Sequence, residues 1–428
     1  MSTTLMRDLP PSSAPEEPSG LAVLRNNMLT RIVFVTIFGL AIMSLTRIVS
    51  GKEDLTSAGA LGGMMNAAVP ILLAGLGGLW SERAGVVNIG LEGQMILGTW
   101  FAADFAWKTG NPWMILVGGI VGGLLGGLLH AIATVGFGVD HIVSGVALNI
   151  LAPGIAKYLA GIYFNSDAGV AAGGGPTQSP KVSTLSTLQW NSFGDWLGKV
   201  NGHHWFLISD IAGLLQGLVT SLNWFTIIAI LLVPLTWFVL WRTAFGLRLR
   251  SVGENPTSAE TLGVKVHTMK ICAVLVSGAL AGLGGAFLVE YTGIYRENQT
   301  AGRGYIGLAA MIFGNWRPGG LLAGSGLFGY TDALQQQTDA PTVHALLLIV
   351  AIILVLAGLY AAWRGRRLQA VIAIVAGVLV GVWYATTDSI PAQFATYSPQ
   401  ILTLLVLAVA SQRLRMPAAD GLPWRRAQ

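Results

Sequence analysis

The chain has 428 residues, of which 53% are hydrophobic and 11% are charged, whereas ordinary soluble domains carry roughly 25% charged residues. So few charges cannot cover the surface of a soluble protein of this length, so a soluble enzyme is excluded and a polytopic membrane protein is indicated. The net charge of +5 comes from scattered basic residues, which argues against a nucleic-acid partner, and the single Cys272 excludes an intrachain disulfide and a cysteine-based metal site.

The first 28 residues are polar and rich in proline between positions 10 and 18. We predict that residues 1–28 form a disordered cytoplasmic tail. The first apolar run, about 30–48, is long enough to cross a bilayer and differs from the shorter apolar core of a signal peptide, which a small-residue cleavage site follows. We therefore expect this helix to stay in the mature protein.

Apolar stretches continue along the chain and predict an all-α membrane protein with about 10–12 transmembrane helices between residues 29 and 412. The short stretch 303–316 falls below the roughly 20 residues that cross a bilayer, so some helices are expected to be tilted, broken or re-entrant. The predicted spans lie at 30–48, 57–80, 84–107, 112–135, 139–164, 223–241, 269–290, 303–316, 319–337, 343–362, 368–387 and 398–412.

The basic residues predict an orientation. With the N-terminus inside, most of the 25 Lys and Arg residues fall on the cytoplasmic side, concentrated in short loops and in the tail 413–428. This asymmetry is the one that the positive-inside rule uses. Both termini are therefore expected in the cytoplasm.

Two loops are long enough to have a role. The outer loop, 165–222, carries tryptophans such as Trp196 and Trp205, a residue type that is enriched at membrane interfaces. We expect this loop to lie along the membrane surface or to cap the mouth of a path. In the cytoplasmic loop, 242–268, the Asn255–Pro256 pair marks a turn, after which Thr257 or Ser258 is expected to cap a short helix. That loop is either a rigid contact for a soluble partner or a solvated basic connector.

Polar residues at membrane depth are the candidates for function, because burying them is costly unless they are paired or face water. Asn88, Glu92 and Gln94 lie in a glycine-punctuated stretch that predicts a helix break. They either line a path or tie helices together. We expect neighbouring backbone or hydroxyl groups to satisfy Glu92, and Asn88 to face the path more directly. Asn149 and Asp332 are weaker candidates of the same kind.

Two glycine patterns concern helix packing. The hexapeptide Leu-Ala-Gly-Leu-Gly-Gly occurs at 73–78 and again at 280–285, on spans of opposite predicted direction. This fits an inverted repeat with the path at the repeat interface, although such a match also arises by chance in a chain with 56 glycines. Glycines at four-residue spacing over 118–127 predict close helix packing.

Several stretches carry a resemblance to a known family. They are Leu79-Trp-Ser-Glu-Arg-Ala-Gly-Val-Val-Asn-Ile-Gly-Leu-Glu-Gly-Gln-Met, then 140–149, the inner loop, 300–318 and the closing Ala419-Asp-Gly-Leu-Pro-Trp424. In that order they resemble the permease subunits of nucleoside and simple-sugar ATP-binding-cassette (ABC) importers. The long outer loop and the 368–387 span depart from the family in size.

The resemblance implies a bacterial inner-membrane permease subunit with no catalytic chemistry and no cofactor of its own. Its expected partners are a cytoplasmic ATPase, a second related permease in a heterodimer, and a substrate-binding lipoprotein outside. The chain agrees in having no Gly-x-x-x-x-Gly-Lys-Ser/Thr phosphate loop. The expected ATPase contacts are Arg248, Arg250, Gly253, Glu254, Asn255, Pro256, Glu260 and Gly263, and the expected path residues are Asn88, Glu92, Gln94, Asn149 and Asp332.

Two other classes of protein are weighed against this interpretation. An ion-coupled secondary transporter would need a carboxylate deep in a span, for which Glu92 and Asp332 are the candidates. A membrane enzyme would need acidic and histidine residues at catalytic or metal-ligand spacing, which the sequence does not offer.

Overall fold

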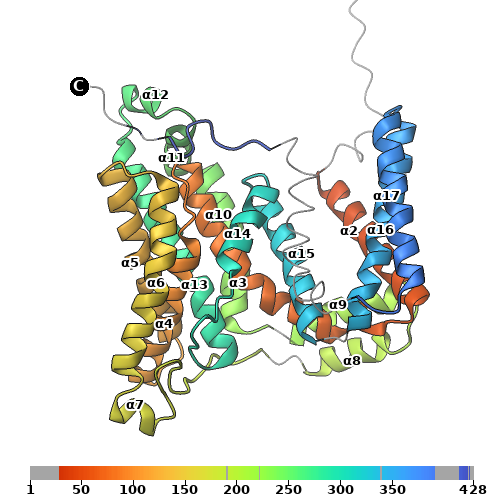
Figure 1. Ribbon diagram of the computed structural model, residues 1–428, viewed down its shortest axis with the longest axis horizontal. Coiled ribbons are helices and arrows are strands. Elements are labelled where there is room, and N and C mark those ends of the chain that lie inside the picture. The colour runs from red at the N-terminus through yellow and green to blue at the C-terminus, as the bar shows by residue number, and fades with distance from the viewer. Residues whose placement is uncertain are drawn as a thin grey trace, which may run out of the picture.

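The computed structural model describes residues 28–188, 191–220, 222–337, 340–390, 414–422 and 424 (Figure 1). Every regular secondary-structure element within these residues is helical. The predicted all-α fold class is therefore confirmed.

The helices run between two ends of a bundle (Figure 1). One end carries α11 (Ala244–Glu254) and α12 (Pro256–Thr261), and we call it the α12 end; the other carries α7 (Asp167–Ala171), and we call it the α7 end. Seven stretches of the described residues are helical, long and apolar enough to cross a membrane. They are α3 (Ala58–Arg83), α5 continued by η2 (Met114–Gly136), α6 (His141–Tyr163), α10 (Trp224–Arg242), α13 (Val266–Thr292), α16 over His344–Trp363, and α17 (Arg367–Thr386).

The other helices are not among these seven. Eleven of the twelve predicted spans each overlap one α-helix, and the twelfth, 398–412, lies outside the described residues. The prediction for 84–107 is wrong at its start, because residues 84–90 are not helical and α4 begins at Leu91. The other elements are α2 (Met28–Ser50), η1 (Glu53–Thr56), α4 (Leu91–Thr109), α8 (Asn191–Asn201), α9 (Ile208–Thr220), α14 (Arg303–Phe313), α15 (Pro318–Gln337) and the full α16 (Ala340–Trp363).

Glycines bring the central helices α3, α4, α5 and α13 into backbone contact. Gly122 of α5 faces Leu97 of α4, whereas Gly123, one position along, faces Gly278 of α13. A Cβ atom at either glycine would collide with a backbone carbonyl oxygen. The predicted role of the 118–127 glycines in close helix packing is confirmed, and it follows that α5 is held by two neighbours at once.

The two copies of the hexapeptide lie on helices that pack against each other. Gly77 of α3 lies against Ser277 of α13, and Gly284 of α13 lies against Pro70 of α3. The contact moves back along α3, from residue 77 to residue 70, as it moves forward along α13, from residue 277 to residue 284. The two helices are therefore antiparallel, as the predicted opposite directions require.

Gly123→Val is expected to destabilise the fold, because the new side chain must enter the backbone contact between α5 and α13. Overpacking of a tight contact costs about 1–3 kcal/mol. Gly154→Val on α6 is the matched control, since a Cβ at Gly154 has no other group within 4 Å. Thermal unfolding in detergent, monitored by size-exclusion chromatography, should show a clearly lower midpoint temperature for Gly123→Val and little change for Gly154→Val. Equal curves would contradict the packing role.

The predicted outer loop, 165–222, folds into helices at the α7 end. Gly213 and Gly217 of α9 lie against the backbone of Thr56 in η1 and of Ala58 at the start of α3. Arg47 of α2 forms a buried ion pair with Asp210 of α9, with 3.4 Å between Nη1 and Oδ1. Figure 1 shows α8 and α9 extending across this end of the bundle. The loop is therefore a folded cap over α2 and α3.

Candidate translocation site

Two helices begin inside the bundle instead of at its ends. α3 ends at Arg83, residues 84–90 turn back without helical structure, and α4 begins at Leu91. In the same way residues 293–302 follow α13, and α14 begins at Arg303. Gly307 of α14 lies against the carbonyl oxygen of Ile71, which is near the middle of α3. α14 therefore starts about halfway along the bundle.

The Glu92 carboxylate joins the starts of these two helices. It accepts hydrogen bonds from the Thr300 hydroxyl at 2.6 Å, from the Gly302 amide at 2.9 Å and from the Gly304 amide at 2.7 Å. Only 6% of Glu92 is exposed. Its oxygens thus cap the N-terminus of α14, whose first N–H groups have no partner within the helix. The expectation that backbone and hydroxyl groups satisfy Glu92 agrees with this geometry.

Asn149 on α6 caps the start of α4 in a similar way. Its Oδ1 accepts from the Gly93 amide at 2.8 Å, while its Nδ2 donates to the Ile89 carbonyl oxygen at 2.9 Å and to the Tyr305 hydroxyl at 3.0 Å. Tyr305 on α14 is 47% exposed. We call this set, Glu92, Asn149, Thr300, Gly302, Gly304 and Tyr305, the α4–α14 junction.

Asn88 and Gln94 lie beside the junction but deeper in the core. Asn88 Nδ2 donates to Gln94 Oε1 at 3.0 Å and to the Ser277 hydroxyl of α13 at 2.8 Å. Both side chains are fully buried. In this conformation Asn88 ties the 84–90 turn to α13, and the expectation that it faces the path more directly than Glu92 stays a prediction.

The 84–90 turn is also held from α5 and α6. His130 Nε2 lies 3.0 Å from the Val87 carbonyl oxygen, and the Val87 amide donates to His141 Nδ1 at 3.3 Å. His130 Nδ1 lies 2.9 Å from the Ser144 hydroxyl. The turn is therefore fixed on three sides, by α5, α6 and α13.

Asp332 forms an ion pair that the sequence analysis did not anticipate. Its Oδ2 lies 2.8 Å from Nη2 of Arg303, and about one sixth of each side chain is exposed (17% and 16%). Arg303 is the first residue of α14, so the pair links α14 to α15. The position of Arg303, a basic residue at the start of a short apolar stretch, was the sequence feature that could have indicated a partly buried ion pair.

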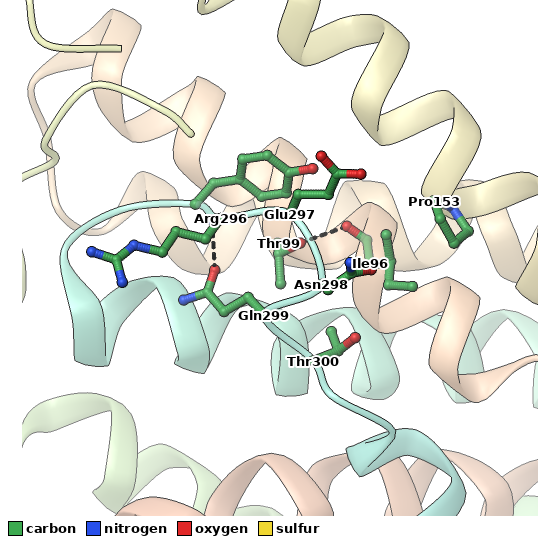
Figure 2. A pocket seen from close by; sticks show the side chains of 9 residues that line it. Ile96, Thr99, Pro153, Arg296, Glu297, Asn298, Gln299 and Thr300 are labelled. Carbon is green, nitrogen blue, oxygen red and sulfur yellow. Dashed lines mark hydrogen bonds between the residues drawn. The ribbon is translucent and has the colours of Figure 1, made fainter. Parts of the chain in front are cut away.

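A small pocket lies beside the junction, lined by residues of α4, of α6 and of the loop that follows α13 (Figure 2). Figure 2 shows the loop 295–300 crossing in front of α4, with Pro153 of α6 beside it. The Arg296 amide donates to Gln299 Oε1 at 3.1 Å, which holds the loop closed on itself. Thr300 belongs both to this pocket and to the cap of α14, so the pocket borders the junction.

The predicted cytoplasmic loop forms two helices at the α12 end. Thr243 caps α11 through the Gly246 amide at 3.1 Å, and Asn255 caps α12 through the Ser258 amide at 3.0 Å. The predicted cap at Thr257 or Ser258 is therefore wrong. Asn255 takes that place because Pro256 is suited to the first helical position, which moves the cap one residue before it.

The residues expected to contact an ATPase differ in exposure. Glu254 and Asn255 are exposed, and so are Arg248 and Gly263. Pro256 and Glu260 are half-buried. Gly253 is inside α11 and not in a turn, and it is buried against the Arg83 carbonyl oxygen. Arg250 donates to the Leu240 carbonyl oxygen at 2.9 Å, so it holds α11 to α10.

No group of His, Cys, Asp and Glu residues within the described part of the chain could hold a metal ion. The exposed side chains at the α12 end instead include large apolar ones. Leu262 after α12 is 84% exposed and Leu247 on α11 is 61% exposed. This surface is suited to contact with another protein.

Comparison with known proteins places the chain in a family. The pattern of the "branched-chain amino acid transport system / permease component" family matches residues 60–358. The chain belongs to this permease family. It is a family of transporters, and the seven long apolar helices agree with a multi-pass membrane protein.

Individual relatives match over most of the chain. The nucleoside ABC transporter permease NupC of Lactococcus lactis is 32% identical over 367 residues, which cover 84% of this chain and 94% of NupC. The guanosine ABC transporter permease NupQ of Bacillus subtilis is 34% identical over 364 residues, covering 83% and 93%. TsgC13 of Haloferax volcanii, a candidate glucose ABC transporter permease, is 33% identical over 285 residues, covering 66% and 79%. No solved structure matches the chain.

Proposed function

We propose that this chain is the membrane permease subunit of an ABC importer that moves nucleosides into the cytoplasm, using ATP hydrolysed by a separate subunit. The observation that carries the proposal is the similarity to NupC and NupQ over more than four fifths of the chain. Both relatives are nucleoside permeases by name, one of them for guanosine. The polar interior of the α4–α14 junction supports a solute that forms hydrogen bonds.

The α4–α14 junction is the proposed solute path, together with Asn88, Gln94 and Asp332. Helices that begin at mid-depth expose backbone groups only where protein or a cavity surrounds them. Broken helices of this kind form the solute sites of many transporters. Tyr305 and Asn149 present an aromatic ring and an amide, which suit the base and the sugar of a nucleoside.

The α12 end is the proposed cytoplasmic face, with both termini on that side. Arg248, Arg242 and Lys265 there are exposed basic residues, as the positive-inside rule favours. On this proposal α11 and α12 contact the ATPase, and Leu247 and Leu262 contribute apolar area to that contact. The folded cap formed by α8 and α9 then lies outside, where a binding lipoprotein would deliver the solute.

A second permease is the proposed partner within the membrane. NupB, another nucleoside ABC transporter permease of Lactococcus lactis, is also similar to this chain, at 26% identity over 308 residues. The helix α6 supports a lateral partner, because its buried side is a narrow stripe that includes Leu148 and Ala156, and much of the rest is exposed. Asn149 and Tyr305 lie at the edge of that exposed face.

The ion-coupled alternative finds less support in the geometry. Glu92 already accepts three hydrogen bonds, and Asp332 is paired with Arg303. A coupling carboxylate would have to exchange these partners for an ion or a proton during each cycle.

Uptake of labelled guanosine is expected to depend on this chain and on ATP. The measurement compares a strain lacking the gene, the complemented strain, and the complemented strain with the ATPase inhibitor vanadate in membrane vesicles. Excess unlabelled nucleoside should compete strongly, and ribose or glucose weakly. Uptake by the purified chain alone, driven by a proton or sodium gradient, would show that the ABC assignment is wrong. Competition by glucose but not by nucleosides would show that the solute is a sugar instead of a nucleoside.

A further inference from the structure

We propose that the C-terminal segment, residues 414–422 with Trp424, is a strap that positions α14 by linking it to α11. We call it the C-terminal strap. The inference rests on the proposed function, because it assigns to the strap the transfer of motion from the ATPase side to the α4–α14 junction. Figure 1 shows this segment running along the α12 end of the bundle to α11.

The first contact of the strap is with α11. The Ala419 amide donates to the Gly253 carbonyl oxygen at 2.9 Å, and the Ala418 amide donates to Glu254 Oε2 at 3.2 Å. Gly85 fits tightly between Ala419 and Gly253, and its positive φ of +78° is a conformation that favours glycine. The strap, α11 and the turn that follows α3 are therefore in backbone contact at one point.

The second contact is with the turn between α14 and α15. The Arg415 amide donates to Asn315 Oδ1 at 2.7 Å. Asn315 has a φ of +55°, a conformation that asparagine tolerates better than most residues. The next residue, Trp316, donates from its indole to Glu82 Oε2 at 2.6 Å and accepts from Arg83 through its carbonyl oxygen. The turn is thus bound by the strap on one side and by the end of α3 on the other.

The third contact anchors the end of the strap. Trp424 packs on the small cluster formed by Val252 of α11, Ala259 of α12 and Val266 of α13. Its ring also meets the His267 ring edge to face, with centroids 4.9 Å apart. The strap therefore ends on the same helices that we propose to contact the ATPase.

A buried carboxyl group lies between these contacts. Asp420 Oδ1 is inaccessible to solvent and has no hydrogen-bond partner. Glu82, Arg83 and Lys270 lie near it from α3 and α13. Burial raises the pKa of Asp420 to about 7, while hydrogen bonds with the Glu82 carboxyl and the Gly421 amide and the nearby charges of Lys270 and Arg83 lower it. The strap is therefore packed into the bundle and is not a loose tail.

These contacts hold α14 at both ends. Glu92 caps its N-terminus in the α4–α14 junction, and the strap and α3 hold its C-terminal turn. A shift of α11 moves Gly253 and Glu254, and through Ala418 and Ala419 it moves the strap. The bond to Asn315 passes that displacement to α14, and thus to the solute path.

A matched pair of variants tests the strap. Asn315→Gly keeps the tolerance for positive φ but removes the acceptor for the Arg415 amide, whereas Asn315→Asp keeps an acceptor oxygen. In the purified importer complex, Asn315→Gly should lower the nucleoside transported per ATP hydrolysed by roughly three- to tenfold, the shift expected for one lost hydrogen bond. Asn315→Asp should stay near the wild type, and hydrolysis should continue in both.

Amide hydrogen exchange separates the strap from the proposed function. Exchange in the Arg415 region should be faster in Asn315→Gly than in the wild type, whatever solute the importer carries. Faster exchange with no guanosine uptake by the wild type would refute the solute class and leave the strap contact intact. Unchanged exchange, or a parallel loss of complex yield, hydrolysis and uptake in Asn315→Gly, would overturn the strap.

Discussion

Glu92→Ala is expected to abolish uptake and to lower the stability of the protein. The substitution leaves the Thr300 hydroxyl and the amides of Gly302 and Gly304 without their acceptor in a buried place. Each buried donor left unpaired costs about 1–3 kcal/mol. The N-terminus of α14 also loses the carboxylate that complements its dipole. Both effects act at the start of the helix that we place in the solute path.

Glu92→Gln should be intermediate, because its amide oxygen replaces only one of the two carboxylate oxygens. The Gln amide nitrogen cannot accept the hydrogen bond from Gly304. Glu53→Ala, at a 70% exposed side chain, is the control and should leave uptake unchanged. The measurements are uptake in cells and thermal unfolding in detergent. Full uptake by Glu92→Ala would show that Glu92 has no role in transport.

Breaking the pair of Arg303 and Asp332 on one side only is expected to be the other large effect. Removing one member of a buried ion pair costs about 3–5 kcal/mol, since it leaves an uncompensated charge. The cost here is smaller, because about one sixth of each side chain is exposed (16% and 17%). Arg303→Gln and Asp332→Asn should each reduce uptake strongly.

The double variant Arg303→Gln with Asp332→Asn should transport better than either single variant. The two neutral side chains retain a hydrogen-bonding contact between α14 and α15 and leave no unpaired charge. A double-mutant cycle on uptake and on thermal stability measures this coupling. Strictly additive effects would show that the two residues act independently, contrary to the 2.8 Å contact.

The polar residues at the helix break could be predicted from the sequence, but their hydrogen-bond partners could not. The glycines around Asn88 and Glu92 predicted a helix break, and residues 84–90 are indeed not helical. Thr300 and Gly302, which satisfy Glu92, lie about two hundred positions further along the chain. Only the packing of α14 on α3 and α4 brings them there, and local pattern does not carry that information.

Asn88 shows why its orientation could not be predicted. Four residues separate it from Glu92, which on a continuous helix places both on one face. The chain is not helical before Leu91, so that spacing rule does not apply, and Asn88 points to Ser277 instead. The prediction of the α12 cap failed for a local reason. The preference of proline for the first helical position outweighed the capping preference of Thr257 and Ser258.

The capped helix starts have a consequence for the charge of the solute. The beginning of a helix is a natural binding place for phosphate groups, because its free N–H groups point at the anion. At the start of α14 a carboxylate of the protein already occupies that place, and at the start of α4 the amide oxygen of Asn149 occupies it. A nucleotide would bring its phosphates against the Glu92 carboxylate, which already takes up the amides of Gly302 and Gly304. If the junction lines the path, we therefore expect the permease to favour neutral nucleosides over the phosphorylated compounds that share the same base and sugar.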